Sequence, residues 1–451
     1  MAIFNFFKPK PAIQKKLNEP QINVENIELN DGQKEIFNRL EDSTEHFFIT
    51  GEAGTGKSVL LQYVKKHSKK SLIVGVFTGV AALNVGAQTL NSLFGLPFGF
   101  IHLDKLRVTK KVATLLRHID VVVIDEISMV RADMMDAIDF LLREARGNDI
   151  PFGGVQLVMF GDLYQLPPVV SDRALNQYFA HNHGGPYFFN ALVWKKAKLA
   201  IFELTRNVRQ KDDENFRTLL NSIRRGETLE HVLSAINERK VSPVPEDGVI
   251  TLATKNDIVE IINNRRLNQI SEKLYEYHAE ITGDLEKSAF PAEEFLRLKK
   301  GAQVMFLKND TPGKRWVNGT LGTVLSLSES EIKVAIDGIP YSVARQTLYK
   351  VRYFYDIETR RIKEEPLSSF TQFPLGLAWA FTIHKSQGKT YNSIVLDIGD
   401  GAFAHGQTYV GLSRCRSLNG VHLKRAINRE DIIVDQIVIS FMLQAHITKV
   451  D

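Results

Sequence analysis

Residues 51–58 read GEAGTGKS, and they stand between the apolar stretch HFFIT and the helix-like stretch VLLQYVKK. This is the G-x-x-x-x-G-K-[ST] pattern in the strand–loop–helix setting that a phosphate-binding P-loop requires. Glycines let backbone N–H groups wrap a phosphate chain at a helix N-terminus, where the helix dipole favours negative charge. The stretch predicts an α/β nucleotide-binding fold, with the nucleotide held by Gly51, Ala53, Gly54, Thr55, Gly56, Lys57 and Ser58.

Apolar bursts around the P-loop extend this prediction to a domain over residues 30–230. SLIVGVF at 71–77, DVVVIDE at 120–126 and VQLVMFGD at 155–162 are flanked by glycine or acid, as buried parallel strands are. RADMMDAIDFLLREA at 131–145 instead spaces its apolar residues as a helix does. Strands alternating with helices predict a parallel sheet covered by helices on both sides.

A second α/β domain is predicted from residue 231 onward, because GVITLAT and NSIVLDI again read as buried strands. Between them lie short alternating strands, two of which are joined by Asp337-Gly338, a strong hairpin signal. We therefore expect a small β-barrel over 308–370, inserted into a second domain that comprises 231–307 and 371–451.

Two carboxylates at the end of a predicted strand are the natural partners of the P-loop. VVVIDE ends in Asp125 and Glu126, and open α/β sheets bind ligands at the carboxyl ends of their strands. We expect Ser58 and Asp125 to hold Mg²⁺, directly or through water, and Lys57 to reach the β and γ phosphate oxygens. Glu126 would polarise the attacking water.

Two glutamines are weaker candidates for the same site. Gln165, in the GDLYQLPP stretch that follows the next predicted strand, is a neutral donor suited to sensing a γ-phosphate or its water. Gln33, in LNDGQKEIF, has an amide that can read the hydrogen-bonding edge of adenine. Considered alone, Gln33 would be interpreted as an ordinary surface residue.

The composition limits the class of protein. The chain of 451 residues has 24% charged and 44% hydrophobic residues, a net charge of +5 and one cysteine. No apolar run approaches the roughly 18 residues of a membrane span, and one cysteine permits no intramolecular disulfide. We expect a cytoplasmic protein with several substructures, whose residues 1–29 form a flexible tail and not a signal peptide.

Ordered motifs along most of the chain resemble superfamily 1B helicases. They are Gln33, GEAGTGKS, TGVAALNVGAQTLNSLFG, IDEISM, GDLYQLPPV, LTRNVRQ, AWAFTIHKSQGKT and YVGLSRCRS. The segment from Asp133 to Val169 further resembles the signature of Pif1 helicases. The resemblance implies two RecA-like domains that bind ATP between them and move 5′ to 3′ on single-stranded DNA, as bacterial-type, nucleoid-associated enzymes. It points to replication, recombination, repair or telomere maintenance, and the residues do not choose among these.

The same resemblance assigns roles to residues that composition leaves open. Arg209 of LTRNVRQ and Arg414 of YVGLSRCRS are expected to reach the γ-phosphate, although either arginine could by itself be a solvated charge. Gln387 and Gly388 are expected to contact the nucleotide and to couple its binding to the binding of DNA. The inserted barrel is expected to be SH3-like, and residues near 94–112 to form a small wedge.

Contacts with DNA are predicted for small polar, basic and aromatic residues in three places. Each hydroxyl could instead cap a helix, and each aromatic could instead belong to a local core. The expected partners are single-stranded DNA and its junctions with duplex, with G-quadruplex DNA as a further candidate and a monomer as the working form. The predicted contacts are Thr78, Asn91, Ser92, Phe98, Trp316, His384, Lys385 and Ser386.

Three other functions remain to be separated from a DNA helicase. A P-loop kinase would need an acceptor pocket and lid, and it would leave the arginines at 209 and 414 unexplained. An ATP-dependent switch would hydrolyse ATP on nucleic acid without displacing a strand. A remodeller of RNA or RNA–DNA hybrids shares these motifs, because the motifs do not reveal which sugar is recognised.

Overall fold

The computed structural model of the chain describes residues 28–451, apart from 79–81, 83–86, 98, 171, 211, 242, 244, 246–247, 286, 288–289, 309, 311–314, 317, 357 and 360. The side chains of residues 361, 362 and 364 also fall outside this description. Nearly all of the expected N-terminal tail, and Phe98, lie outside the described residues.

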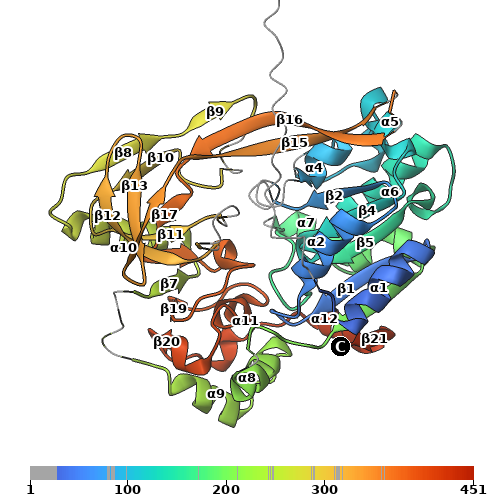
Figure 1. Cartoon of the computed structure of the whole chain (residues 1–451). Helices are drawn as coiled ribbons and strands as arrows, with labels where there is room; N and C mark the ends of the chain where they lie inside the picture. The colour runs from blue at the N-terminus through green and yellow to red at the C-terminus, as the bar shows by residue number, and fades with distance from the viewer. Residues whose placement is uncertain are drawn as a thin grey trace, which may run out of the picture.

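A seven-stranded sheet, parallel throughout, forms the first α/β region (Figure 1). In sheet order its strands are β21 (Ile447–Val450), β6 (Leu199–Leu204), β1 (His46–Gly51), β5 (Gln156–Phe160), β4 (Val121–Asp125), β2 (Leu72–Val76) and β3 (Gln88–Thr89). The predicted strands at 71–77, 120–126 and 155–162 are β2, β4 and β5, and are confirmed. The P-loop leaves β1, which lies inside the sheet with a strand on each side.

Alternate side chains of these strands face two helical layers, as the period of two in a strand requires. Phe47 and Ile49 of β1 belong to the apolar cluster that contains Ile36 and Leu60, whereas Phe48 belongs to the cluster on the other face. The helices of this region are α1 (Asp31–Asp42), α2 (Lys57–His67), α4 (Leu90–Phe94), α5 (Lys110–Arg117), α6 (Ala132–Arg146), α7 (Arg173–Asn182) and α12 (Gln436–Gln444). No helix among the described residues has both the length and the apolar content to cross a bilayer.

The second α/β region is a four-stranded parallel sheet. Its order is β18 (Ala380–Thr382), β7 (Ile250–Ala253), β19 (Ile394–Asp397) and β20 (Val421–Leu423), so the predicted strands GVITLAT and NSIVLDI are confirmed. Its helices, with those of the connection that leads into it, are α8 (Glu214–Arg224), α9 (Glu230–Asn237), α10 (Asn256–Gln269) and α11 (Gln407–Leu412). Short 3₁₀ turns occur at Leu103–Lys105, Ile127–Met129, Pro151–Gly154, Phe188–Asn190, Leu192–Lys195, His384–Ser386, Leu418–Gly420 and Arg429–Asp431.

Antiparallel strands form the insertion that the sequence predicted, but the insertion is larger than expected. It starts well before residue 308, and its strands are β8 (Tyr275–His278), β9 (Glu280–Thr282), β10 (Phe295–Leu298), β11 (Gln303–Phe306), β12 (Leu321–Leu327), β13 (Ile332–Ile336), β14 (Ile339–Val343), β15 (Gln346–Asp356), β16 (Arg361–Gln372) and β17 (Leu375–Leu377). The Asp337-Gly338 hairpin is confirmed, with both residues at positive φ. The earlier strands have three or four residues each, too short for a clear alternating pattern.

The C-terminal boundary of the second domain was also predicted wrongly. Residues 447–450 do not extend the second sheet but pair in parallel with β6 at the edge of the first, with Thr448 opposite Phe202. A four-residue strand carries no signal for the sheet edge that it will join, because any open edge offers the same backbone groups.

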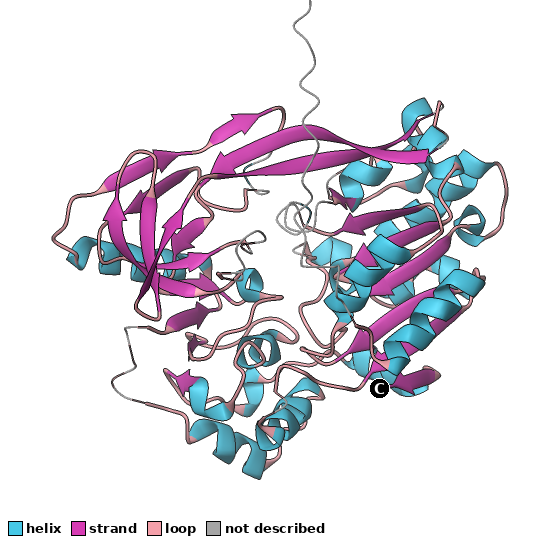
Figure 2. Ribbon diagram, in the orientation of Figure 1, coloured by secondary structure: helices cyan, strands magenta, loops and turns pink. Residues whose placement is uncertain are grey.

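A long hairpin of β15 and β16 reaches from the antiparallel region back to the first sheet (Figure 2). The backbone N–H of Tyr353 donates to the side-chain oxygen of Gln88 at 2.9 Å, and the ring of Tyr355 stacks on His118 at 3.5 Å between centroids. The hairpin thus contacts the first region on the side where Asn91 and Ser92 lie.

Candidate active site

The P-loop turns between β1 and α2, with its glycines in conformations that other residues rarely adopt. Gly54 has a φ of 95°, and a Cβ built there would lie 2.5 Å from the Cβ of Arg209. Glycine therefore lets the segment carrying Arg209 approach the loop closely. The Nζ of Lys57 donates to the carbonyl oxygens of Gly51 at 2.7 Å and Glu52 at 2.9 Å.

The two carboxylates at the end of β4 are half-buried near this lysine. Glu126 has a φ of 52°, and its backbone N–H donates to the side chain of Asp125 at 2.9 Å. Burial raises the pKa of both carboxyls, and for Glu126 burial and the adjacent charge of Asp125 raise it to about 7. Burial also lowers the pKa of Lys57 to about 8. Glu126 is therefore poised to exchange a proton near neutral pH.

Gln387 joins the second region to this carboxylate. Its Nε2 donates to an oxygen of Glu126 at 2.9 Å and to the side-chain oxygen of Gln165 at 3.2 Å. Gln165 in turn donates to Asp162 at 3.5 Å. Gln165 and Gln387 therefore meet beside Glu126, although they come from regions far apart in the sequence.

The two predicted arginines lie at the boundary between the regions, Arg414 buried and Arg209 half-buried. Arg414 is 1% exposed and donates to the carbonyl of Val410 at 2.9 Å and the hydroxyl of Ser413 at 2.8 Å. Arg209 donates to the carbonyl of Ser413 at 3.0 Å. Burial lowers the pKa of both, and for Arg209, where the charge of Arg414 adds to burial, to about 9. Neither is a solvated surface charge.

A cavity of about 670 Å³ collects these groups from both regions and from the segment that connects them. Gln33 lies behind the P-loop, 6% exposed, and its Nε2 donates to the carbonyl of Gly56 at 3.4 Å, so it is not the surface residue that it could have been. The predicted residues that line the cavity are Ala53, Gly54, Thr55, Gly56, Lys57, Ser58, Asp125, Glu126, Gln165, Arg209, Gly388 and Arg414.

Several polar residues of the site were not predicted. Asp162 and Arg224 form a buried ion pair at 2.9 Å, and Tyr409 accepts from the backbone N–H of Ala53 at 3.1 Å. Asp162 follows β5 much as Asp125 ends β4, so the strand-end rule could have found it. Nothing in the sequence marks Arg224 as its partner.

The donor set near the P-loop suits one kind of metal ion. Among the described residues, no three His, Cys, Asp or Glu side chains come together as a metal cluster. The hydroxyl of Ser58 and the carboxylate of Asp125 both line the cavity. Two oxygen donors fit Mg²⁺, which is held by few protein ligands, substrate phosphates and water.

The predicted DNA contacts are more dispersed than the nucleotide residues. Thr78, His384 and Lys385 are exposed, whereas Asn91 and Ser92 are half-buried. The amide of Asn91 donates to the carbonyl of Pro97 at 2.9 Å, and the hydroxyl of Ser92 accepts from Gln88 at 3.2 Å.

Two predicted DNA contacts are buried in this structure. Trp316 is 5% exposed and stacks on Phe306 at 4.3 Å within the core of the antiparallel region, which favours the interpretation of a packed corner over that of a base-stacking loop. Ser386 is fully buried, and its hydroxyl donates to the carbonyl of Ile383 at 2.7 Å. Trp316 is a core aromatic, and Ser386 has a hydroxyl that closes a turn.

The geometry defines a P-loop nucleoside triphosphatase whose cavity is completed by arginines from outside the P-loop. Comparison with known proteins narrows this class: the PIF1-like helicase profile matches residues 28–233, and the profile of the Pif1 2B domain matches residues 284–327. The ATP-dependent DNA helicase Pif1 of Bdellovibrio bacteriovorus is 33% identical, over 93% of each chain. Human ATP-dependent DNA helicase PIF1 is 34% identical, but this chain spans only 58% of its length.

Solved structures agree with this assignment. Bacteroides Pif1 in complex with ADP-AlF4 is 38% identical and superposes with a TM-score of 0.86, over 93% of this chain and 97% of that one. Bacteroides Pif1 bound to single-stranded DNA covers the same shares, with a TM-score of 0.67. The chain belongs to the PIF1-like helicase family, with two RecA-like domains. Unliganded Bacteroides Pif1 superposes with a TM-score of 0.85, so the arrangement resembles the unliganded and ADP-AlF4 structures more than the one bound to single-stranded DNA.

Proposed function

We propose that this chain hydrolyses ATP in the cavity between its two parallel sheets and thereby moves 5′ to 3′ along single-stranded DNA, unwinding duplex ahead. The observation that carries the proposal is the origin of the cavity lining, which comes from both regions and the segment between them. A nucleotide bound there favours one arrangement of the regions over another, and such differential binding is what a motor requires.

The residues of the cavity suit an in-line attack of water on the γ-phosphorus. Glu126, whose pKa is raised to about 7, accepts a proton from the water as the bond between the γ-phosphorus and the β–γ bridging oxygen breaks. Lys57 holds the β and γ oxygens, while Arg209 and Arg414 donate to the oxygens on which charge is spread in the transition state. The products are ADP and phosphate.

The remaining nucleotide contacts follow from the same geometry. Ser58 and Asp125 would hold Mg²⁺, which when bound neutralises charge on the β and γ oxygens. Gln33 lies behind Gly56, within reach of a base held beside the P-loop. Gln387, which donates to both Glu126 and Gln165, would orient the attacking water together with Gln165.

For the DNA track, we propose Thr78, Asn91 and Ser92 in the first region and His384 and Lys385 in the second. The segment near 94–112 would act as the wedge, and the antiparallel strands as an SH3-like 2B domain. Titles of related structures describe Bacteroides Pif1 bound to single-stranded DNA and two Pif1 helicases at forked duplex DNA, which supports this class of substrate. We further propose that one copy suffices and that G-quadruplex DNA is a substrate.

The test is single-turnover unwinding of forks with a 5′ or a 3′ single-stranded tail, with Mg²⁺-ATP turnover measured beside it. We expect ATP hydrolysis to be stimulated by single-stranded DNA and only the 5′-tailed substrate to be unwound. Stimulated hydrolysis without strand displacement would favour an ATP switch, and equal stimulation by RNA of the same sequence would favour a remodeller of RNA. Unwinding from 3′ tails alone would overturn the direction.

A further inference from the structure

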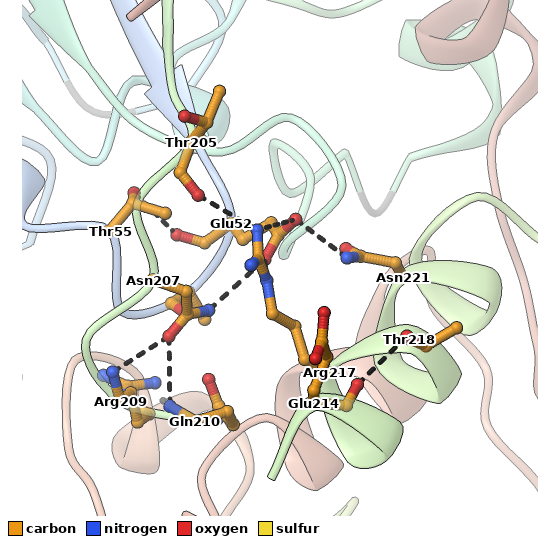
Figure 3. Close-up of polar contacts among 12 residues, drawn as sticks. Glu52, Thr55, Thr205, Asn207, Arg209, Gln210, Glu214, Arg217, Thr218 and Asn221 are labelled. Carbon is orange, nitrogen blue, oxygen red and sulfur yellow. Dashed lines mark hydrogen bonds and ion pairs between the residues drawn. The ribbon is translucent and has the colours of Figure 1, made fainter. Parts of the chain in front are cut away.

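Glu52 lies within the P-loop, yet its side chain points away from the nucleotide cavity. The P-loop residues that line the cavity run from Ala53 to Val59 and do not include it. Figure 3 shows its carboxylate among side chains of helix α8 and the segment before that helix. Its oxygens accept from Arg217 at 3.0 Å, Asn221 at 2.8 Å and Asn207 at 3.3 Å.

The carboxylate is held as an anion by these donors. Burial alone raises the pKa of Glu52, but hydrogen bonds from Arg217, Asn221 and Asn207 outweigh burial and hold the pKa below its usual value. Its side chain is 17% exposed, so this ion pair is more shielded from water than an ordinary surface pair. The hydrolysis mechanism above has no use for this charge.

Helix α8 connects the P-loop to two other parts of the site. At its C-terminal end Arg224 pairs with Asp162, beside Gln165. At its N-terminal end Asp213 caps the helix and also accepts from the backbone N–H of Leu418 in the second region at 2.9 Å. The helix also packs against α11, which leads into Arg414. Helix α8 is therefore fastened to both regions.

Asn207 provides a second route from Glu52 to the arginines. Its amide nitrogen donates to the carbonyl of Ala53 at 3.0 Å, while its oxygen accepts from the backbone N–H groups of Arg209 and Gln210. Gln210 then donates to the carbonyl of Cys415 at 2.9 Å. Hydrogen bonds therefore run from the P-loop to the backbone on both sides of Arg414, as Figure 3 shows for their first half.

We propose that Glu52 is a positioning residue that fixes the P-loop relative to Arg209 and Arg414 through helix α8 and Asn207. The inference rests on the proposed ATP hydrolysis and deepens it. Glu52 would leave nucleotide binding alone and act on turnover, because misplacing transition-state donors by about 1 Å can cost a hundredfold in rate. Loosening these contacts should also weaken the link between the two regions and hence the stimulation of turnover by DNA.

The test compares Glu52→Ala, Arg217→Ala and the double variant in the full chain. We expect each single variant to lower the kcat of DNA-stimulated ATP hydrolysis by about 10- to 100-fold, with the KM for ATP changed by less than about threefold. Because both changes break the same contact, the double variant should be no slower than the singles. Glu52→Gln, which keeps an acceptor for Asn221, should recover part of the loss.

The matched control is Arg225→Ala, which removes an exposed arginine at the end of the same helix, 4.0 Å from Glu227. Its kcat should stay within twofold of the wild type. Arg217 is 35% exposed and also donates to the carbonyl of Thr205, so we expect the variants to fold, which their melting temperatures check.

Two outcomes would overturn the proposal: unchanged kcat in Glu52→Ala, or a KM for ATP raised in proportion to the loss. Multiplying losses in the double variant would count against action through Arg217. These results differ from a failure of the proposed function, in which the wild-type chain itself would show no ATP turnover stimulated by DNA.

Discussion

The nucleotide cavity and the candidate DNA track differ in what holds their side chains in place. In the cavity, Arg414 is almost fully buried and hydrogen-bonded to backbone and hydroxyl oxygens, and Glu126 is fixed by Gln387. On the track, Lys385 and Thr78 are exposed on loops at the surface. Preorganised groups stabilise developing charge because they need no rearrangement during the reaction. A DNA backbone that moves along the protein surface instead needs contacts that form and break.

The largest expected effect is at Arg414, because it is the most completely buried of the arginines that line the cavity. Replacing it by Ala removes the buried arginine that we propose as a donor to the transition state, and such arginines are worth about 10³ to 10⁵ in rate. We expect Arg414→Ala to lower the kcat of ATP hydrolysis by at least about 10³-fold, with ATP affinity within about threefold. Arg414→Lys should recover little, because Lys keeps the charge but not the planar fork of donors.

Arg416, two positions along, is the matched control, since it is exposed at the rim of the same cavity. We expect Arg416→Ala to lower kcat by less than about tenfold, because an exposed charge is screened by water. Similar losses in both variants would remove the distinction between fixed and solvated arginines, and unchanged turnover in Arg414→Ala would refute its role. A fall in melting temperature would reveal mere loss of packing.

The second prediction concerns pH. Burial and Asp125 raise the pKa of Glu126 to about 7, so its basic form is populated only as the pH rises through that value. The kcat/KM of hydrolysis, which reports the free enzyme, should therefore increase between about pH 6 and 8, and Glu126→Gln should lower it by about 10² to 10⁴-fold and abolish the rise.

Stability should change in the opposite direction. A carboxyl whose folded pKa is raised contributes stability that is complete below its unfolded value and is lost as the pH rises through about 7. Wild-type chain should thus lose thermal stability as the pH rises from about 4.5 to about 7, mostly below the range in which it gains activity, and Glu126→Gln should flatten this dependence. A pH profile unchanged by Glu126→Gln would assign the titration to another group.

The cavity was predictable from sequence because its residues stand next to recognisable strands. Lys57, Asp125 and Gln165 each follow an apolar burst, and parallel strands bring their carboxyl ends to one edge. The contacts of Glu52 were not predictable. Its partners Asn207 and Asn221 lie 155 and 169 positions away, on elements whose placement depends on how the two regions pack.

For the predicted DNA contacts, residue type alone could not decide which side chains are exposed and which are buried. The aromatic of KRWVNG beside basic residues fits a base-stacking loop and a packed corner equally well, and the fold made Trp316 part of the core. Sequence reasoning also missed the strands before residue 308 and the pairing of residues 447–450 with the first sheet. The reason is related: short strands have little local signal, and their pairing is decided by tertiary contacts.

The third prediction tests whether Trp316 belongs to the core or to the DNA track. If its ring belongs to the core, Trp316→Ala should lower the free energy of unfolding by about 3 to 5 kcal/mol, as loss of a buried aromatic does. The affinity for single-stranded DNA, measured well below the melting temperature, should change by less than about twofold, against the larger loss expected of a stacking aromatic. A large loss of DNA affinity with unchanged stability would restore the stacking interpretation.

The smallest expected effect is at Lys385, for which Ser386 is the neighbouring control. An exposed lysine that neutralises one phosphate of single-stranded DNA contributes about 0.7 to the slope of log affinity against log salt, which amounts to about fourfold in affinity at 0.15 M salt. Lys385→Ala should show this loss, and the loss should shrink as salt rises. Ser386→Ala removes only a buried hydroxyl bonded to Ile383, so the salt slope should stay that of the wild type. Equal slopes in both variants would mean that Lys385 does not touch a phosphate, and the second region would then have to hold DNA by other groups, with His384 the first to examine.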